Sequence, residues 1–402
     1  MNQNNLNTPG TGGSPEPGYP GTRTESGWRE PLVFTVLLLA FFGLFVRKMG
    51  LVPMLNTMMN TAYDLLMNTV FYLMAICVLA GALSALLSEF GVVAAVNRLL
   101  SGLLGPLYGL PGAASLGIVT TFLSDNPAIL TLAEEPGFRR YFRPDQLPAL
   151  TNLGTSFGMG LIVCTYMLSL EPVLGQSCAP AAGVGLLGAV VGSIVSTRLM
   201  LRFSRGTALP EGELPAPSAS GPVSLGRRPG SVGSRFLDAM LSGGRSGVDM
   251  GLQIIPGVLI LCTFVMMLTN GPSETGAYTG AAYEGIALLP RLARQAGGIL
   301  TPLFGFSSPE AVAVPVTALG AAGAALGLVE KLAAQGLAGP GDLAVFTAMC
   351  MCWSGYLSTH VSMMNTLGYS HLTGKAILSH TIGGLAAGAA AHWMWVLLQM
   401  LG

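Results

Sequence analysis

An aspartate, an asparagine and a proline stand together, as Asp125-Asn126-Pro127, in a segment that is otherwise apolar. The segment covers residues 112–133 and is long enough to enter a bilayer. An aspartate at the centre of a membrane costs about 2.5–3.5 kcal/mol, so it needs a partner or a function. Pro127 interrupts the helix, and membranes tolerate freed backbone groups only inside protein or beside a wet cavity. We therefore expect a solute or a coupling ion to bind at this break.

Further polar side chains occur within the apolar stretches before and after this motif. In membrane helices such groups either bond to a neighbouring helix or bind a solute, and their spacing alone does not decide between these roles. The motif itself also has a structural interpretation, because Asp and Asn stabilise turns and helix starts before proline. The residues that we expect to bind substrate or ion are Thr121, Ser124, Asp125, Asn126, Thr151, Asn152, Thr155, Ser156, Ser354, Thr359 and His360.

Two other groups have recognisable chemistry. His360 is either a proton relay or a hydrogen-bonded packing residue. Cys350-Met351-Cys352 is compatible with a soft metal ion. Residues two apart on a helix point about 200° apart, however, so this pair chelates poorly and the metal ligands stay unknown. No acid–base or nucleophile pair, phosphate loop or nucleotide fingerprint occurs, so we expect no catalytic residues and no enzyme.

The composition is that of a multi-pass membrane protein of the all-α class. Of 402 residues, 51% are hydrophobic and 9% are charged. The 19 basic and 19 acidic residues cancel, which argues against nucleic-acid binding. We expect the partners to be the lipid bilayer and a small-molecule solute, with a homo-oligomer or a membrane partner also open. We expect no cofactor except a coupling ion, Na⁺ or H⁺, and a location in the prokaryotic cytoplasmic membrane.

Composition also divides the chain. Residues 1–27 are rich in Asn, Gly, Pro and Ser and predict a disordered tail that lacks the pattern of a signal peptide. Residues 28–60 predict an N-terminal transmembrane helix and a connector. Residues 206–235 form a linker rich in Pro, Gly and Ser between two similar regions, 61–205 and 236–402.

These two regions form an internal repeat. The block Leu104-Gly105-Pro106-Leu107-Tyr108-Gly109 matches Leu300-Thr301-Pro302-Leu303-Phe304-Gly305, at an offset of 196 (302 − 106). Upstream, Asp64 pairs with Asp249 at an offset of 185 (249 − 64), and the difference lies in the polar loop 271–284. Each repeat predicts a span, an interfacial helix, a broken or re-entrant hairpin, a polar span and a further span. The polar motif at 124–127 falls on Gly320-Ala321-Ala322-Gly323, which carries no charge.

The orientation of the repeats is left open by two topologies. Arginines at 139–143 and from 198 to 245 belong on the cytoplasmic side. If the broken segment spans the membrane, the repeats are parallel; if it is re-entrant, they are inverted. The inverted arrangement places Arg47-Lys48 outside, whereas the parallel one places Asp125 and Pro127 at mid-bilayer in a continuous helix.

The order of elements and the Leu-x-Pro-Leu-[Tyr/Phe]-Gly blocks resemble the Gate-domain (nucleoside recognition domain) membrane proteins, over residues 61 to about 398. That group is similar to concentrative nucleoside transporters and includes spore-maturation membrane proteins and the membrane part of the ferrous-iron transporter. The resemblance implies inverted repeats, with a solute held between hairpin tips at 124–127 and 320–323. It also implies unwound spans at 151–156 and 353–359. The second tip departs from the pattern, because it offers only backbone groups.

The residues and the resemblance together predict a secondary transporter of a small polar solute such as a nucleoside-like one, coupled to an ion and with its site at the midplane. Two alternatives stay open at this point. One is a membrane assembly or maturation factor that transports nothing, which the bare second tip fits. The other is a metal-ion transporter.

Overall fold

A computed structural model describes residues 28–134, 136–206, 230–273 and 275–401 of the chain. The predicted tail at 1–27 and most of the predicted linker lie outside these residues. The chain divides into two units, residues 1–48 and 49–402, and the predicted repeats both belong to the second unit. In the first unit, helix α1 (Arg29–Met49) is apolar along most of its length, and large side chains such as Leu32 and Phe34 are exposed. That pattern suits a helix surrounded by lipid.

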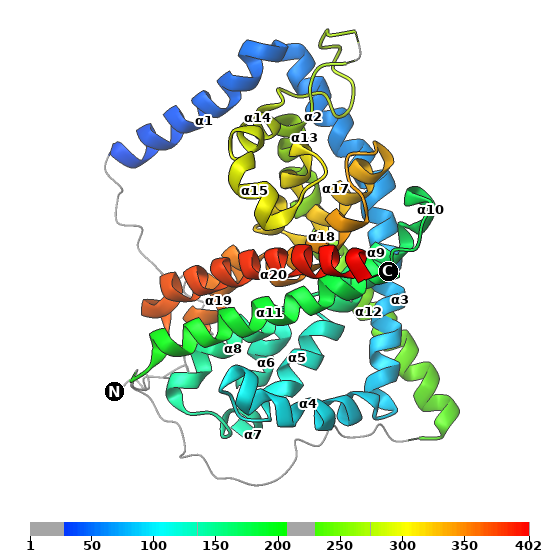
Figure 1. Cartoon of the computed structure of the whole chain (residues 1–402), viewed down its shortest axis with the longest axis vertical. Helices are drawn as coiled ribbons and strands as arrows, with labels where there is room; N and C mark the ends of the chain where they lie inside the picture. Colours follow the sequence, from blue (N-terminus) through cyan, green and yellow to red (C-terminus); the bar gives the residue numbers. More distant parts are fainter. Residues whose placement is uncertain (1–27, 135, 207–229, 274, 402) are drawn as a thin grey trace, which may run out of the picture. The chain divides into compact units, whose positions relative to one another are not determined.

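Every regular element among the described residues is a helix, as the composition predicts (Figure 1). By length and composition, six helices can cross a membrane, or seven if a pair bent by 79° counts as one span. The first repeat contains α2 (Leu51–Asp64), η1 (Leu65–Val70), α3 (Phe71–Glu89), α4 (Val92–Tyr108), α5 (Ala114–Leu123), α6 (Pro127–Glu134), α7 (Pro136–Arg139), η2 (Pro144–Gln146), α8 (Leu147–Thr155), α9 (Gly160–Ser169), α10 (Glu171–Leu174) and α11 (Ala179–Ser204). The second contains α12 (Val232–Gly257), η3 (Val258–Cys262), α13 (Thr263–Thr269), α14 (Leu288–Gln295), α15 (Gly297–Phe304), η4 (Pro309–Val312), α16 (Ala313–Ala318), α17 (Ala322–Ala334), α18 (Pro340–Cys352), α19 (Tyr356–Thr366), η5 (Ser370–Leu372) and α20 (Thr373–Leu401).

The first span of each repeat is longer than the sequence pattern suggests. Residues that we expected to form a connector are helical and continue through η1, a π-helical segment, into α3, so that Leu51–Glu89 is one helix of 39 residues. In the second repeat, Val232–Thr269 is a helix of 38 residues and contains the π-helical segment η3. Polar residues such as Asn56 and Asn60 hide this continuity, because they lower hydropathy without breaking a helix.

Each repeat contains a helical hairpin where one was predicted. Helices α5 and α6 pack together around residues 124–126, which we call tip 1. Helices α16 and α17 pack together around residues 319–321, which we call tip 2. Pro127 begins α6, since its fixed φ and missing N–H suit the first turn of a helix. The first break lies where it was predicted, whereas the second lies at 319–321 rather than 320–323, because Ala322 and Gly323 already belong to α17.

Each repeat also contains a broken span after its hairpin. Helices α8 and α9 are separated by residues 156–159 (break 1), and α18 and α19 by residues 353–355 (break 2). The prediction of an unwound segment at 151–156 is wrong, because Thr151–Thr155 lie in α8. Met159, with φ +55°, and Gly355, with φ +66°, occupy the left-handed region at the same offset of 196 (355 − 159).

Glycines allow two pairs of long helices to touch backbone to backbone. Between α3 and α12, Gly81 and Gly243 each face the carbonyl oxygen of the other. Between α11 and α20, which run side by side in Figure 1, a Cβ on Gly192 would lie 2.5 Å from both the Ala387 methyl and the Gly383 carbonyl oxygen. Small residues permit such close packing in membranes, where dispersion rather than the hydrophobic effect joins helices.

Candidate functional site

Both tips and both breaks border one cavity of about 190 Å³. Its lining comes from tip 1, tip 2, the two breaks, α12, α17 and α19. The lining residues are Asp125, Asn126, Met159, Met250, Gln253, Ile254, Gly257, Gly320, Ala321, Ala322, Gly323, Ser354, Gly355 and Thr359. Segments about 196 residues apart in the sequence thus meet at one place, as expected if each repeat supplies half of the site.

Tip 1 is held by its own side chains. The Ser124 hydroxyl donates to the carbonyl of Thr120 over 2.7 Å. The Asn126 backbone N–H donates to the Asp125 carboxylate, also over 2.7 Å. This bond stabilises the turn that precedes α6, and Asp125 also lines the cavity. The structural and binding interpretations of Asp125 are compatible.

Asn126 links the two repeats. Its side-chain N–H donates to the carbonyl oxygen of Ser354 in break 2. Its side-chain oxygen is buried and has no hydrogen-bond partner. Asn126 as a whole is 1% exposed and lines the cavity. An unpaired buried polar atom is costly, about 1–3 kcal/mol, so it calls for an explanation such as an absent ligand.

Tip 2 is held through the backbone. The Gly355 N–H donates to the carbonyl of Ala318 over 3.1 Å, which joins break 2 to the hairpin. A Cβ on Gly355 would lie 3.1 Å from the Gly320 oxygen, and its positive φ also disfavours a side chain. Helix α12 presses on the other side of the tip, where a Cβ on Gly323 would lie 2.8 Å from Ile254. The side chains of tip 2 are small because the backbone is closely surrounded.

Charge is distributed unevenly around the cavity. Among the described residues that line it, Asp125 alone is charged. Two carboxylates elsewhere in the second unit have partners: Asp64 pairs with Lys331 at 3.0 Å, and Glu330 accepts from the Tyr166 hydroxyl at 3.2 Å. The lining therefore carries one carboxylate, on Asp125, and no cationic side chain.

The structure brings some of the expected binding residues to the cavity and keeps others away. Asp125, Asn126, Ser354 and Thr359 line it. The expected residues outside the lining are Thr121, Ser124, Thr151, Asn152, Thr155, Ser156 and His360.

Most residues of the second group have hydrogen bonds within or between helices. Thr121 donates to the carbonyl of Gly117 over 2.8 Å, and Thr151 to that of Pro148 over 2.7 Å. Asn152 donates to the Ser196 hydroxyl over 3.0 Å and to the carbonyl of Ala376 over 3.1 Å, and so joins α8 to α11 and α20. Such bonds between helices are the structural role that membrane Asn and Ser often have.

Three more of the expected residues outside the lining differ in whether their polar atoms are hydrogen-bonded. Ser156 donates to the carbonyl of Asn152 over 2.8 Å. The Thr155 hydroxyl and both ring nitrogens of His360 are buried and make no hydrogen bond of ordinary geometry.

The lining residues that come from α12 and from break 1 were not among those expected from the sequence. Gln253 is a polar residue within an apolar span, so its type alone could have identified it. Met159 could have been found from the repeat, because it aligns with Gly355. Met250 and Ile254 carry no signal that separates them from other apolar residues of the same helix.

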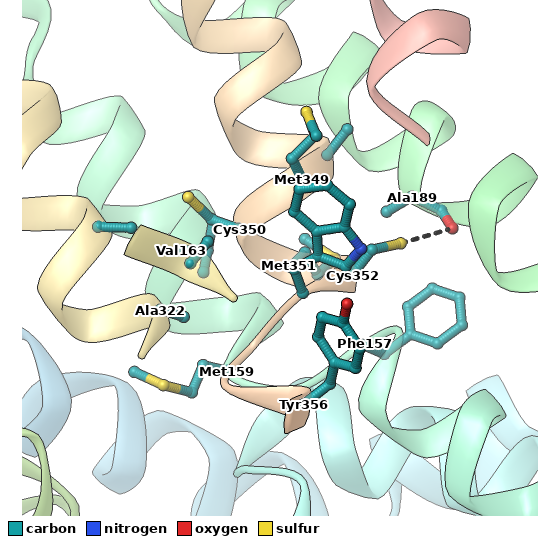
Figure 2. Packing of buried hydrophobic residues seen from close by; sticks show 14 of the residues in the cluster. Phe157, Met159, Val163, Ala189, Ala322, Met349, Cys350, Met351, Cys352 and Tyr356 are labelled. Carbon is teal, nitrogen blue, oxygen red and sulfur yellow. Dashed lines mark hydrogen bonds between the residues drawn. The ribbon is translucent and has the colours of Figure 1, made fainter. Parts of the chain in front are cut away.

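The Cys350-Met351-Cys352 segment does not form a metal site in the part of the chain that is described. Figure 2 shows the two thiols pointing in different directions, and the Cys352 thiol donates to the carbonyl of Ala189 over 3.6 Å. A search of the described residues finds no group of three or more His, Cys, Asp or Glu side chains placed to hold a metal ion. Break 2 starts directly after this segment, and Tyr356 and Phe157 lie beside it in Figure 2.

Comparison with solved structures finds this architecture in concentrative nucleoside transporters. A double variant of CNTnw in an outward-facing state matches with a TM-score of 0.51 and 14% sequence identity, over 90% of this chain and 84% of that one. A second double variant of CNTnw, also outward-facing, matches with a TM-score of 0.50 at the same identity and coverage. The sequence itself matches no family model and no curated protein. At this identity the likeness shows the fold alone: the chain has the fold of a multi-pass helical membrane transporter.

Proposed function

We propose that the protein is a secondary transporter that holds a small polar solute between its two hairpin tips and is coupled to an ion. The observation that carries this proposal is Asn126, which lines the cavity beside Asp125 and whose buried side-chain oxygen has no partner. A solute that donates a hydrogen bond would satisfy that oxygen. Binding such a solute would remove the cost of leaving that oxygen unpaired.

The lining indicates which solutes fit. Asp125 and the Asn126 oxygen accept hydrogen bonds, so the solute presents hydroxyl or N–H groups, or the site holds a coupling cation. Typical drug-sized sites measure about 300–1,000 Å³, so a cavity of about 190 Å³ suits a smaller solute. A nucleoside-like solute is the finer form of the proposal, supported by the fold shared with concentrative nucleoside transporters. The coupling ion is Na⁺ or H⁺.

Transport of a solute through the cavity would require a hairpin or a whole repeat to move. The bond from Asn126 to the carbonyl of Ser354 joins tip 1 to break 2, so it must open or exchange when tip 1 leaves. We further propose that the hairpins are re-entrant and the repeats inverted, in the manner of the Gate-domain proteins. Arg139, Arg140 and Arg143 then lie on the cytoplasmic side of a prokaryotic cell membrane.

Solute binding can be tested first on the purified protein. A thermal-shift screen of nucleosides, bases, amino acids and ions should find at least one compound that raises the melting temperature, because a ligand that binds the folded state stabilises it. Asp125→Ala should abolish that shift. Asp145→Ala, which changes a carboxylate paired with Arg143 in a loop, should retain it.

Cysteine labelling then locates the site. Thr359→Cys lies in the cavity, whereas Thr366→Cys lies on an exposed turn of the same helix. The compound found in the screen should slow labelling at position 359 and leave position 366 unaffected. Equal protection at both positions, or wild-type uptake by reconstituted Asp125→Ala, would reject the cavity as the transport site.

A membrane assembly factor that transports nothing is the second candidate. The absence of polar side chains from Gly320-Ala321-Ala322-Gly323 favours it, because a solute site between two tips needs recognition from both. A stoichiometric partner that copurifies, together with no compound that protects Thr359→Cys, would support this alternative.

A further inference from the structure

Two histidines lie side by side in the interior, outside the cavity lining. His360 on α19 and His380 on α20 are both fully buried, and their ring centroids are 4.6 Å apart. The ring of Tyr356 lies 5.7 Å from that of His360 and 5.0 Å from that of His380. Ionisable groups at membrane depth are costly and therefore indicate a function.

The hydrogen bonds of His380 fix its neutral form. Its Nε2 lies 2.5 Å from the carbonyl oxygen of Cys352, which can only accept, so Nε2 carries the proton. Its Nδ1 lies 2.9 Å from the Ser196 hydroxyl. Asn152 already donates to that hydroxyl oxygen, so Ser196 directs its own hydrogen to Nδ1. The chain Asn152 to Ser196 to His380 to Cys352 is complete and leaves no free lone pair on the His380 ring.

His360 is the opposite case. The side chain is fully buried, and neither ring nitrogen makes a hydrogen bond of ordinary geometry, although one interacts with the backbone of Tyr356 one turn earlier. A neutral imidazole has one N–H and one lone pair, so His360 has a free nitrogen that can accept a proton. The Tyr356 ring stands edge-on to the His360 ring, at an angle of 88°.

The pair is connected to the cavity through break 2. His380 binds the carbonyl of Cys352 through its ring, and its own carbonyl accepts from the Trp353 indole over 3.3 Å. The next residues, Ser354 and Gly355, line the cavity. Thr359 also lines it and directly precedes His360. A change of charge in the pair therefore acts on break 2, which lines the cavity.

We propose that the His360–His380 pair binds a single proton, taken up from water by the free ring nitrogen of His360, and that this proton is the coupling ion. The pair takes one proton rather than two, because two positive charges at this separation in a buried place repel strongly. The proton returns to water when the site opens on the other side. The coupling rests on the proposed transport function, whereas the proton site itself does not.

Several of the elements that pack against the two helices of the pair carry titratable residues. On the elements that pack against α19 and α20, helices α8 and α15 have no titratable side chain. The titratable side chains on the remaining elements and on α19 and α20 themselves are Tyr356, His371, Lys375, His392, Cys350, Cys352, Asp342, Arg198, Arg202 and Glu134.

Tryptophan fluorescence tests the proton site without any solute. In the full-length chain with Trp28, Trp393 and Trp395 replaced by Phe, Trp353 is the sole indole beside the pair. A protonated imidazole quenches indole emission, so the signal should fall in one step on acidification. His360→Gln should abolish the step, and His371→Gln, which changes an exposed histidine on η5, should retain it.

A second measurement guards against variants that do not fold. Nitrogen NMR of ¹⁵N-histidine in the otherwise unaltered protein should show one buried ring as the Nε2–H form at high pH, and one buried ring gaining a proton as the pH falls. A Trp353 step that persists in His360→Gln, or two buried rings that never gain a proton, would overturn the proposal.

Proteoliposomes with an imposed pH gradient separate this proposal from the transport function. In the wild type, uptake of the compound found by thermal shift should follow the pH gradient. His360→Gln should still bind that compound, but its uptake should no longer follow the gradient. Gradient-driven uptake that is unchanged in His360→Gln would remove the coupling role alone. A proton step without any solute binding would remove the transport function and leave the proton site.

Discussion

At an offset of 196, residues 124–126 of tip 1 fall on residues 320–322 of the second hairpin, and both hairpins border the same cavity. Tip 1 presents a carboxylate and a side-chain amide, and its bond to Ser354 reaches across to the other repeat. Tip 2 presents backbone, and its bond from Gly355 stays within its own repeat. Both hairpins therefore share the break in the backbone, but polar side chains that could recognise a solute occur only at the tip of the first.

The largest effect is expected where tip 1 meets the other repeat. Asn126→Ala removes the donor to the Ser354 carbonyl and the free acceptor in the cavity. We expect uptake to fall to background and stability to fall by about 1–3 kcal/mol, since a buried carbonyl loses its partner. Uptake by proteoliposomes and thermal unfolding measure the two effects. Ala322→Gly, at the matching position of the second hairpin, should retain uptake; equal loss in both would contradict the asymmetry between the tips.

A smaller effect is expected from filling space beside each tip. A Cβ on Gly158 in break 1 would overlap the Asn126 side chain and lie 3.0 Å from the Ser354 hydroxyl. We expect Gly158→Ala to destabilise by about 1–3 kcal/mol through overpacking. Gly355→Ala should cost about 1–2 kcal/mol, because its positive φ disfavours a side chain. Gly175→Ala, also at positive φ but with open space around it, separates backbone strain from crowding in the same unfolding assay.

The aspartates that precede the two hairpins provide a weaker test. Asp64 accepts from Asn68 and pairs with Lys331, whereas Asp249, at the offset of 185, is exposed. The Asp64 pair is partly exposed, so Asp64→Asn should lower stability by no more than about 1 kcal/mol. Asp249→Asn should change stability by only a few tenths of a kcal/mol. Comparable losses at both positions in chemical denaturation would show that the repeats are more alike here than their contacts indicate.

The smallest effect concerns the polar loop 271–284, which lengthens the second repeat. Burial alone would raise the pKa of Glu284, but donation from the Thr279 hydroxyl and amide and the Gly280 amide outweighs it and lowers that pKa. A lowered pKa stabilises the fold above the unfolded value of about 4.3, and this contribution disappears as the pH falls through the folded value. Protection of the loop amides, taken relative to their intrinsic exchange rates at each pH, should therefore fall below about pH 4. Glu284→Gln should be less protected at neutral pH and should show a flatter response to acid.

The sequence predicted the class, the order of elements and the positions of the hairpin tips, because these depend on local signals. Pro127 fixes a helix start, and the Pro-Leu-aromatic-Gly blocks fix the repeat. The polar run on α8 was harder to interpret, since its periodicity does not reveal which neighbour it faces. Asn152 turns towards Ser196 and Ala376, which are distant in sequence. Met250 and Gln253 join the cavity through α12, where the repeat offset has changed, so the repeat alone could not place them.

The glycine contacts between α3 and α12 and between α11 and α20 have a consequence for movement. Where two backbones touch with no side chains between them, there are no rotamers to rearrange, so each pair has only one way of fitting together. Each pair should therefore travel as a single block through the transport cycle, and bending should be confined to the short non-helical segments around the cavity. Distances between spin labels placed across either pair should stay constant while distances across the cavity change.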